Sequence, residues 1–252
     1  GTPFSDLLTS KGIVPGIKVD LGTKDFHGFK GEVVSQGLDN LDARFEEYYD
    51  LGARFAKWRA VITIDEEETP TEQALRYNAI QLARYSQLAQ AAGIVPMVEP
   101  EVIFDGDHSL ERAEMVTTKT LQILFQTLIE YRVDLQGLIL KSSMVLAGSK
   151  YREQSTPEQV AQATLRTFHM SVPHDCAGIV FLSGGQASKR STDNLNAIAK
   201  MGAQPWPITY SFSRALEEPF LHAWGGKKEN GPAAQKVLVD VCAENSLAAQ
   251  GK

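Results

Sequence analysis

The sequence is poor in cysteine, in long apolar runs and in net positive charge. Its two cysteines, Cys176 and Cys242, have no metal-type spacing and suggest no disulfide framework, so a reducing compartment is expected. No apolar run reaches the roughly 18 residues that a membrane span needs, which argues against a membrane partner. The net charge of −6 gives no general attraction to nucleic acid, so any anionic ligand must be held by a local basic cluster.

Metal-ligand patterns and a signal peptide are also missing. Histidine ligands of a metal usually recur at short fixed spacings, so we expect no metal and no other cofactor. The scattered histidines are His27, His108, His169, His174 and His222. The chain opens with Gly1 rather than methionine and shows no secretory leader. We therefore expect the cytoplasm, with a plastid as the alternative.

Apolar runs of strand length alternate with longer helical patterns along the chain. The expected strands are 13–19, 54–64, 94–101, 135–144, 177–182 and 206–212. The expected helices are 38–52, 69–93, 107–131, 156–170, 191–201, 214–224 and 231–246, and a polar loop follows the first strand. The motifs at 69–72 and 156–159 predict capping boxes with proline at the first helical position.

Alternating strands and helices predict a parallel sheet covered by helices. A doubly wound sheet would fit six strands, but the Gly-rich loop after its first strand is missing. An eight-stranded (β/α) barrel needs two more units, and the absent initial methionine makes an upstream pair reasonable. We therefore favour an α/β class TIM barrel, with residues 1–252 as one domain that carries barrel strands 3–8 and the C-terminal helices.

The stretch 137–144, Gly-Leu-Ile-Leu-Lys-Ser-Ser-Met, predicts an apolar strand buried on both faces and interrupted by Lys141. Burial disfavours the charged form of an amine, and a neutral amine is a nucleophile toward ketones and aldehydes. The plain alternative is a lysine at a strand end that already lies in water. The charges on the other strands decide between these two interpretations.

Charged residues recur on three further strands. Because alternate strand residues share a face, Lys57 is expected beside Arg59, and Glu99 beside Glu101. Lys18 has the comparable place on the first strand. One such pair is usually a structural salt bridge, but charges at matching positions on four successive strands favour a site at the carboxyl ends of the strands.

The chemistry of these side chains suggests their roles. Lys141 is the candidate amine nucleophile, and Lys57 is a neighbouring cation that would keep more of this amine neutral. Glu99 and Glu101 can donate and accept protons while a carbinolamine loses water to become an iminium. The iminium is an electron sink, which aldolase, transaldolase-like and dehydratase-like reactions all use.

The last two strands indicate where an anionic substrate group would bind. Ser183, Gly184 and Gly185 offer backbone N–H groups before a helix. Residues 211–214, Ser-Phe-Ser-Arg, add the hydroxyls of Ser211 and Ser213 and the guanidinium of Arg214. Loops after the final two barrel strands are the usual phosphate position in this architecture. Lys18 and Arg59 could hold a second anionic group, which a doubly phosphorylated sugar would supply.

Together these motifs resemble class I fructose-1,6-bisphosphate aldolase, the metal-independent type that forms a Schiff base. The motifs that carry the resemblance are Gly16-Ile17-Lys18-Val19-Asp20, Gln36-Gly37-Leu38-Asp39, Phe55-Ala56-Lys57-Trp58-Arg59, Val98-Glu99-Pro100-Glu101, Leu140-Lys141, Phe181-Leu182-Ser183-Gly184-Gly185-Gln186 and Ala223-Trp224-Gly225-Gly226-Lys227. The resemblance implies a glycolytic barrel enzyme, a homotetramer, that reversibly cleaves fructose 1,6-bisphosphate into dihydroxyacetone phosphate and glyceraldehyde 3-phosphate.

The resemblance also implies roles for single residues. Lys141 would form the Schiff base, Glu99 would be the general acid–base, and Glu101 and Lys57 would be its catalytic neighbours. The implied phosphate-binding set is Ser183, Gly184, Gly185, Ser211, Ser213 and Arg214, and the implied further cations are Lys18 and Arg59.

The sequence departs from the family pattern at three places. The first two barrel strands, with a catalytic aspartate, are expected to precede Gly1. Ser142 and Ser143 follow the lysine where the family commonly has proline and asparagine, and Ser213 stands where glycine is common.

Two alternatives stay open from the sequence. One is a related Schiff-base barrel with another phosphosugar as substrate. The other is a non-catalytic scaffold or filament-binding protein that has kept the fold.

Overall fold

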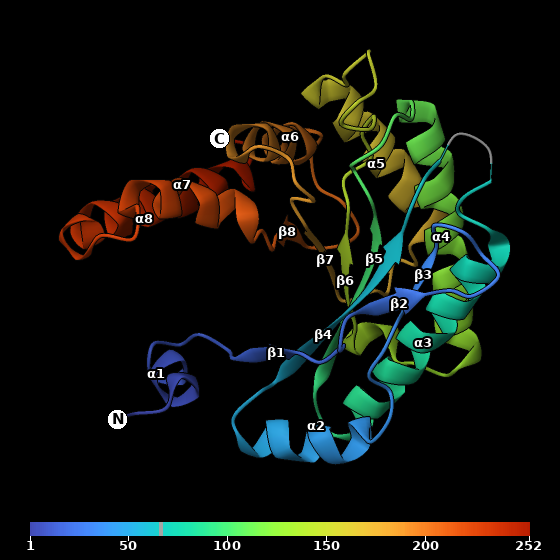
Figure 1. Cartoon of the computed structure of the whole chain (residues 1–252), viewed down its shortest axis with the longest axis horizontal. Helices are drawn as coiled ribbons and strands as arrows, with labels where there is room; N and C mark the ends of the chain where they lie inside the picture. The colour runs from blue at the N-terminus through green and yellow to red at the C-terminus, as the bar shows by residue number, and fades with distance from the viewer. Residues whose placement is uncertain (66–67) are drawn as a thin grey trace.

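The computed structural model describes residues 1–65 and 68–252 and has a parallel six-stranded sheet at its centre (Figure 1). Its strands follow one another across the sheet in the order β1-β4-β5-β6-β7-β8. They are β1 (Gly16–Lys18), β4 (Phe55–Ile62), β5 (Val95–Val102), β6 (Ile139–Ser142), β7 (Gly178–Phe181) and β8 (Ile208–Tyr210). Strand order never reverses, which is the arrangement of consecutive barrel units rather than of a doubly wound sheet.

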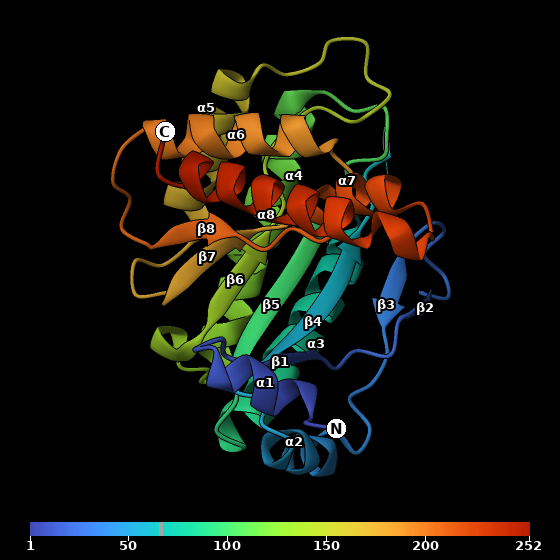
Figure 2. The same cartoon turned by 90° about the vertical axis from the view of Figure 1, so that its left-hand side faces the viewer.

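Helices connect the strands, and some of them lie along one face of the sheet. Figure 1 shows α3, α4 and α5 side by side on that face, and Figure 2 shows α6, α7 and α8 together at one end of the molecule. The helices are α1 (Phe4–Ser10), α2 (Leu41–Asp50), α3 (Glu72–Ala91), α4 (Leu110–Glu130), α5 (Pro157–Ser171), α6 (Ser188–Lys200), α7 (Arg214–Trp224) and α8 (Gly231–Ala248), with short 3-10 turns at Leu135–Gly137 and Lys228–Asn230.

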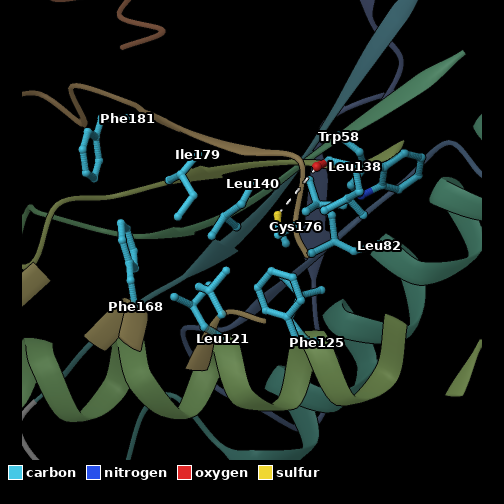
Figure 3. Packing of buried hydrophobic residues seen from close by; sticks show 14 of the residues in the cluster. Trp58, Leu82, Leu121, Phe125, Leu138, Leu140, Phe168, Cys176, Ile179 and Phe181 are labelled. Carbon is cyan, nitrogen blue, oxygen red and sulfur yellow. Dashed lines mark hydrogen bonds between the residues drawn. The ribbon is translucent and has the colours of Figure 1, made fainter. Parts of the chain in front are cut away.

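The main core lies between the sheet and α3, α4 and α5. Burial alternates strictly along β4, where Ala56 and Trp58 are buried and their neighbours are half-buried. Figure 3 shows Leu121 of α4 and Phe168 of α5 facing the buried side chains of β6 and β7. Each large apolar side chain buried there contributes roughly 1.5–3 kcal/mol, so this face anchors the sheet. The opposite strand face is left for polar residues.

The region after β1 differs from the expected polar loop. It forms an antiparallel pair, β2 (Thr23–Asp25) with β3 (Val33–Ser35). All three residues of β2 are exposed, so the segment carries no apolar alternation that could reveal a strand. Helix α1 was not expected either, although Phe4, Leu7 and Leu8 have helical spacing, and none of its residues is buried.

Only one of the two expected capping boxes is present. At α5, Thr156 Oγ1 accepts the Gln159 N–H at 3.3 Å, and Gln159 Oε1 accepts the Thr156 N–H at 2.9 Å. Helix α3 begins later than the pattern at 69–72 predicts, with Thr71 as its N-cap. The Thr71 N–H and hydroxyl both donate to the Glu32 carboxylate, a partner distant in sequence that local spacing does not reveal.

The α5 capping box gives a stability prediction. Thr156→Ala leaves the first turn of α5 without its side-chain acceptor, so the free energy of unfolding should fall by about 1 kcal/mol. Thr156→Ser keeps the acceptor and should retain most of the stability. Urea denaturation of the three proteins measures the difference, and equal midpoints for the alanine and serine variants would contradict the capping role.

Candidate active site

The inner face of the sheet carries charged residues at neighbouring positions. Alternation along β4 puts Lys57 and Arg59 on the face opposite Trp58, and Glu99 and Glu101 share the corresponding face of β5. Parallel pairing aligns Arg59 of β4 with Glu99 of β5, and it aligns Lys57 of β4 with Lys18 of β1. The side chains of neighbouring strands therefore meet across the carboxyl ends of β4 and β5.

Glu99 is the centre of this arrangement. Its side chain is buried, with the residue 4% exposed, and each carboxylate oxygen meets a different lysine. Oε2 lies 2.8 Å from Lys57 Nζ, and Oε1 lies 3.2 Å from Lys141 Nζ. A buried carboxylate is tolerated when cations and hydrogen bonds replace its water. Glu99 therefore brings both lysine amines into one site.

Glu101 forms the second carboxylate pair of the site. It is buried, and Oε2 accepts a hydrogen bond from Arg59 Nε. An Arg side chain keeps its charge under all ordinary conditions, so it balances Glu101 without taking or giving a proton. The two glutamates of β5 therefore have different partners: two amines for Glu99 and a guanidinium for Glu101.

Asp20, just after β1, is a site residue that was not predicted. It is buried, and its Oδ1 lies 2.8 Å from Lys18 Nζ while its Oδ2 lies 3.9 Å from Lys57 Nζ. Oδ2 also accepts the Arg59 N–H at 3.2 Å. The available signal was the spacing of two from Lys18, the same rule that placed Lys57 beside Arg59.

Lys141 lies on a strand with one open face rather than two buried ones. Leu140 and Ser142 are buried, whereas Ile139 and Lys141 are only half-buried. The Lys141 side chain is 13% exposed, so its amine is close to water as well as to Glu99. The expectation of a strand buried on both faces was wrong, because an inward-facing strand end opens into the cleft.

A cleft of about 450 Å³ collects most of the expected residues. Its walls are Lys57, Arg59, Glu99, Glu101, Lys141, Leu182, Ser183, Gly184, Ser211, Ser213 and Arg214. Gly185 does not line the cleft. It lies beside Arg214, because a Cβ at Gly185 would be 3.5 Å from Arg214 Nη2. Lys18 is also outside it and reaches the site only through Asp20. Leu182 was not predicted because it is an ordinary apolar strand neighbour.

The turn after β7 is built by its two glycines. Gly184 and Gly185 have φ values of +61° and +93°, which residues with side chains rarely adopt. A Cβ at Gly184 would also lie 3.0 Å from Leu182 Cδ1. The next loop does not require glycine, because Ser213 has a φ of −109°. Serine therefore fits at that place without backbone strain.

The cleft is locally cationic although the chain is acidic. Its lining holds four cations, Lys57, Arg59, Lys141 and Arg214, and two carboxylates, Glu99 and Glu101. With all groups ionised, four positive and two negative charges leave two positive charges, against −6 for the chain. Such an excess favours an anionic ligand at low ionic strength. The site can thus combine an amine, proton-transfer groups and an anion-binding surface.

A second cavity, of about 10 Å³, adjoins the cleft. It shares Leu182, Ser183 and Gly184 with the cleft and is also lined by His108 and Gln186. Burial lowers the pKa of His108 below its ordinary value, and the positive charge of Arg112 adds to this effect. The buried Nδ1 of His108 has no hydrogen-bond partner among the described residues. Its charged form is therefore disfavoured in the folded protein.

In the described part of the chain, no group of three or more histidine, cysteine, aspartate or glutamate side chains is arranged to hold a metal ion. None of the described helices has the length and apolar character that crossing a membrane would need.

Comparisons with known proteins point in one direction. The family model described as glycolytic fructose-bisphosphate aldolase class-I matches residues 1–252. A relative in Xanthomonas axonopodis pv. citri, named probable fructose-bisphosphate aldolase class 1, is 48% identical over all of this chain and 75% of its own length. The cytosolic fructose-bisphosphate aldolase 6 of Arabidopsis thaliana is 44% identical over all of this chain and 70% of its own.

A solved structure agrees with these relatives. It is a fructose-bisphosphate aldolase from Plasmodium falciparum in complex with TRAP and a small-molecule inhibitor. Its TM-score is 0.98 at 44% identity, over all of this chain and 73% of that one.

The buried His108 gives a prediction of pH dependence. Its pKa is lowered on folding from 6.5, so in the range below 6.5 the unfolded chain binds more protons than the folded one. The stability that neutral His108 allows is complete above pH 6.5 and is lost as the pH falls toward its folded pKa. His108→Gln should therefore have a flatter dependence of unfolding free energy on pH.

Urea denaturation from about pH 8 to about pH 5 tests this difference. The matched control is His27→Gln, since His27 is exposed and its replacement should leave the pH dependence of the wild type. Parallel curves for the wild type and His108→Gln would contradict the assignment.

Proposed function

Because the chain belongs to the class I fructose-bisphosphate aldolase family, we propose that Lys141 is the amine that forms the Schiff base with its substrate. The reaction of the family is the reversible cleavage of fructose 1,6-bisphosphate, a phosphorylated sugar, into dihydroxyacetone phosphate and glyceraldehyde 3-phosphate. The observation that carries the assignment of Lys141 is its contact with the buried Glu99, 3.2 Å from its Nζ.

The contacts of Glu99 suggest how the proton transfers proceed. The Lys141 amine must lose a proton before it can attack the ketone carbon, and the Glu99 carboxylate is close enough to accept one. When the carbinolamine loses water, a proton must reach the departing hydroxyl, and Glu99 can return it. Lys57 stays on the other oxygen of Glu99 and keeps this carboxylate in place throughout.

The iminium then draws electrons from the bond that breaks. A positively charged nitrogen on the former ketone carbon stabilises the carbanion left when the adjacent carbon–carbon bond is cleaved. A carboxylate of the cleft takes the proton of the hydroxyl on the far carbon of this bond, so that carbon leaves as the aldehyde product. The remaining carbanion carbon takes up a proton, and water adds to the iminium and releases the second product from Lys141. Glu101 is the second carboxylate within the cleft, and Arg59 holds it in place.

We assign the phosphate of the dihydroxyacetone half to the loops after β7 and β8. Backbone N–H groups of the turn at Gly184 and Gly185, the hydroxyls of Ser211 and Ser213, and Arg214 border one end of the cleft. Turns with successive positive φ values and charged guanidinium groups are both common phosphate ligands. Lys18 and Arg59 are proposed for the second phosphate.

Assembly and location are proposals that rest on the relatives. The family resemblance supports a homotetramer, which sedimentation of the intact protein can test. Cytosolic relatives from Arabidopsis thaliana and Pisum sativum support the cytoplasm. Nothing in the comparisons supports the alternative of a non-catalytic scaffold.

Borohydride trapping tests the role of Lys141. Incubation with dihydroxyacetone phosphate and a metal chelator, followed by reduction and peptide mapping, should give a stable adduct on the peptide that contains Lys141. Lys141→Met should abolish both the adduct and essentially all turnover, because the amine that forms the Schiff base is lost and Lys57 is held on the other oxygen of Glu99. Lys150→Met is the control, since Lys150 is an exposed lysine paired with Asp105 and its loss should change neither.

An adduct on another lysine of the folded wild-type protein, or undiminished turnover in Lys141→Met, would overturn the assignment. An absence of any adduct and of turnover in the intact wild type would bring the scaffold interpretation forward.

Glu99→Gln tests the proton-transfer role. The amide has nearly the same shape but cannot shuttle a proton, so turnover should fall by roughly 10²–10⁴-fold, the usual contribution of a general acid–base group. The control Glu72→Gln removes a carboxylate from an exposed pair of contacts with Arg76 and Lys119 and should leave turnover near the wild-type value. Turnover of Glu99→Gln close to wild type would move the role to Glu101.

A further inference from the structure

Gln186 follows the glycine turn directly and is almost completely enclosed. The residue is 4% exposed and does not line the cleft. Its amide is nevertheless fully used: Nε2 donates to the Ser183 carbonyl at 3.1 Å and contacts Met144 Sδ at 3.9 Å. Oε1 accepts a hydrogen bond from Asn194 Nδ2 at 2.7 Å. A buried amide with these partners holds a fixed position.

Gln186 closes the turn with two hydrogen bonds to the Ser183 carbonyl, one from its side chain and one from its backbone. The Gln186 backbone N–H donates to the same Ser183 carbonyl at 3.0 Å, so the turn spans Ser183 to Gln186 with Gly184 and Gly185 between them. Both central residues have positive φ, as in a type I′ turn. Two glycines in succession lose much conformational entropy when they are held in one shape. The second hydrogen bond from the Gln186 side chain offsets part of that cost.

Asn194 anchors this turn to helix α6. It is buried and lies in the interior of the helix, so its amide gives Gln186 a support that does not move with the loop. Gly185 in turn lies next to Arg214, within 3.5 Å of Nη2 for a Cβ placed there. The direction of the turn's N–H groups relative to Arg214 thus depends on a chain of contacts from Asn194 through Gln186 to Ser183.

We propose that Gln186 and Asn194 are positioning residues for phosphate binding, which act on the substrate through the turn at residues 183–185. This inference rests on the proposed assignment of that turn and Arg214 to a phosphate of the substrate. A turn held in its binding shape before the ligand arrives binds more tightly, because less freedom is lost on binding. Neither amide needs to touch the substrate to have this effect.

Gln186→Met tests the proposal, since methionine has a similar length and lacks both amide functions. The KM for fructose 1,6-bisphosphate and the inhibition constant for inorganic phosphate should both rise by roughly tenfold, the effect of losing about one well-placed hydrogen bond to the turn. The turnover number should change far less, because the contacts of Lys141 with Glu99 are untouched. Asn194→Ala removes the anchor without changing the loop sequence and should act in the same direction.

The double variant and a matched control separate positioning from general stability. If the two residues act as one unit, Gln186→Met with Asn194→Ala should raise the phosphate inhibition constant no more than the stronger single variant does. Thr192→Val, also on α6, loses the hydrogen bond to Asn245 Oδ1 at 3.1 Å. It should lower the unfolding midpoint while the inhibition constant stays at the wild-type value.

Arg214→Met, measured in parallel, keeps the two proposals distinguishable. An unchanged phosphate inhibition constant in Arg214→Met would overturn the phosphate assignment itself. Two outcomes would overturn only the positioning role. One is a raised phosphate inhibition constant in Arg214→Met with wild-type values in folded Gln186→Met. The other is a fall in the turnover number of Gln186→Met without any change in its phosphate affinity. If Gln186→Met does not fold, Asn194→Ala decides by the same two outcomes.

Discussion

The burial of Glu99 between two lysine amines is the interaction on which the rest of the site depends. The Glu99 residue is 4% exposed, so its carboxylate has lost most of its water, which close cations replace. Lys57 and Lys141 do so from two different strands, and Asp20 links Lys57 to Lys18 on the far side. Charges therefore alternate in sign along one line. Removing Glu99 would take the carboxylate partner away from the largely buried amine of Lys141, so the strands must keep the registration that brings the two together.

Side-chain hydrogen bonds to the strand backbones help to hold that registration. Tyr85 of α3 is buried, and its hydroxyl donates to the Ala56 carbonyl of β4 and accepts the Met97 N–H of β5 at 3.1 Å. Burial raises the pKa of this phenol, so it remains a neutral donor. On the other side of β5, the Ser143 hydroxyl donates to the Val102 carbonyl at 2.9 Å. The serine that follows the lysine region thus ties the end of β6 to β5.

Sequence reasoning recovered the six strands of the parallel sheet and the charged residues that were predicted on them, because a lysine or glutamate in an apolar strand is costly and therefore informative. It missed Asp20, which stands two residues after Lys18 but lies beyond the end of a three-residue strand, where the spacing rule that placed Lys57 beside Arg59 was not applied. It also placed the start of α3 too early. The N-cap of α3 is Thr71, whose N–H and hydroxyl donate to the carboxylate of Glu32, a residue 39 positions away. Local patterns reveal local contacts such as that of Asp20 with Lys18, whereas the contact of Asp20 with Lys57 and that of Thr71 with Glu32 join residues far apart in the sequence.

The charges of the cleft divide into two kinds with different uses. Lys57, Lys141 and Arg59 each meet a carboxylate, so Glu99 and Glu101 offset part of the attraction of these cations for an external anion. Arg214 is different: it lies exposed at the start of α7, and none of the described carboxylates forms an ion pair with it. Its charge is therefore available to a ligand. Proton transfer and anion binding can thus occupy opposite sides of one cleft, because the carboxylates needed for the first do not neutralise the cation needed for the second.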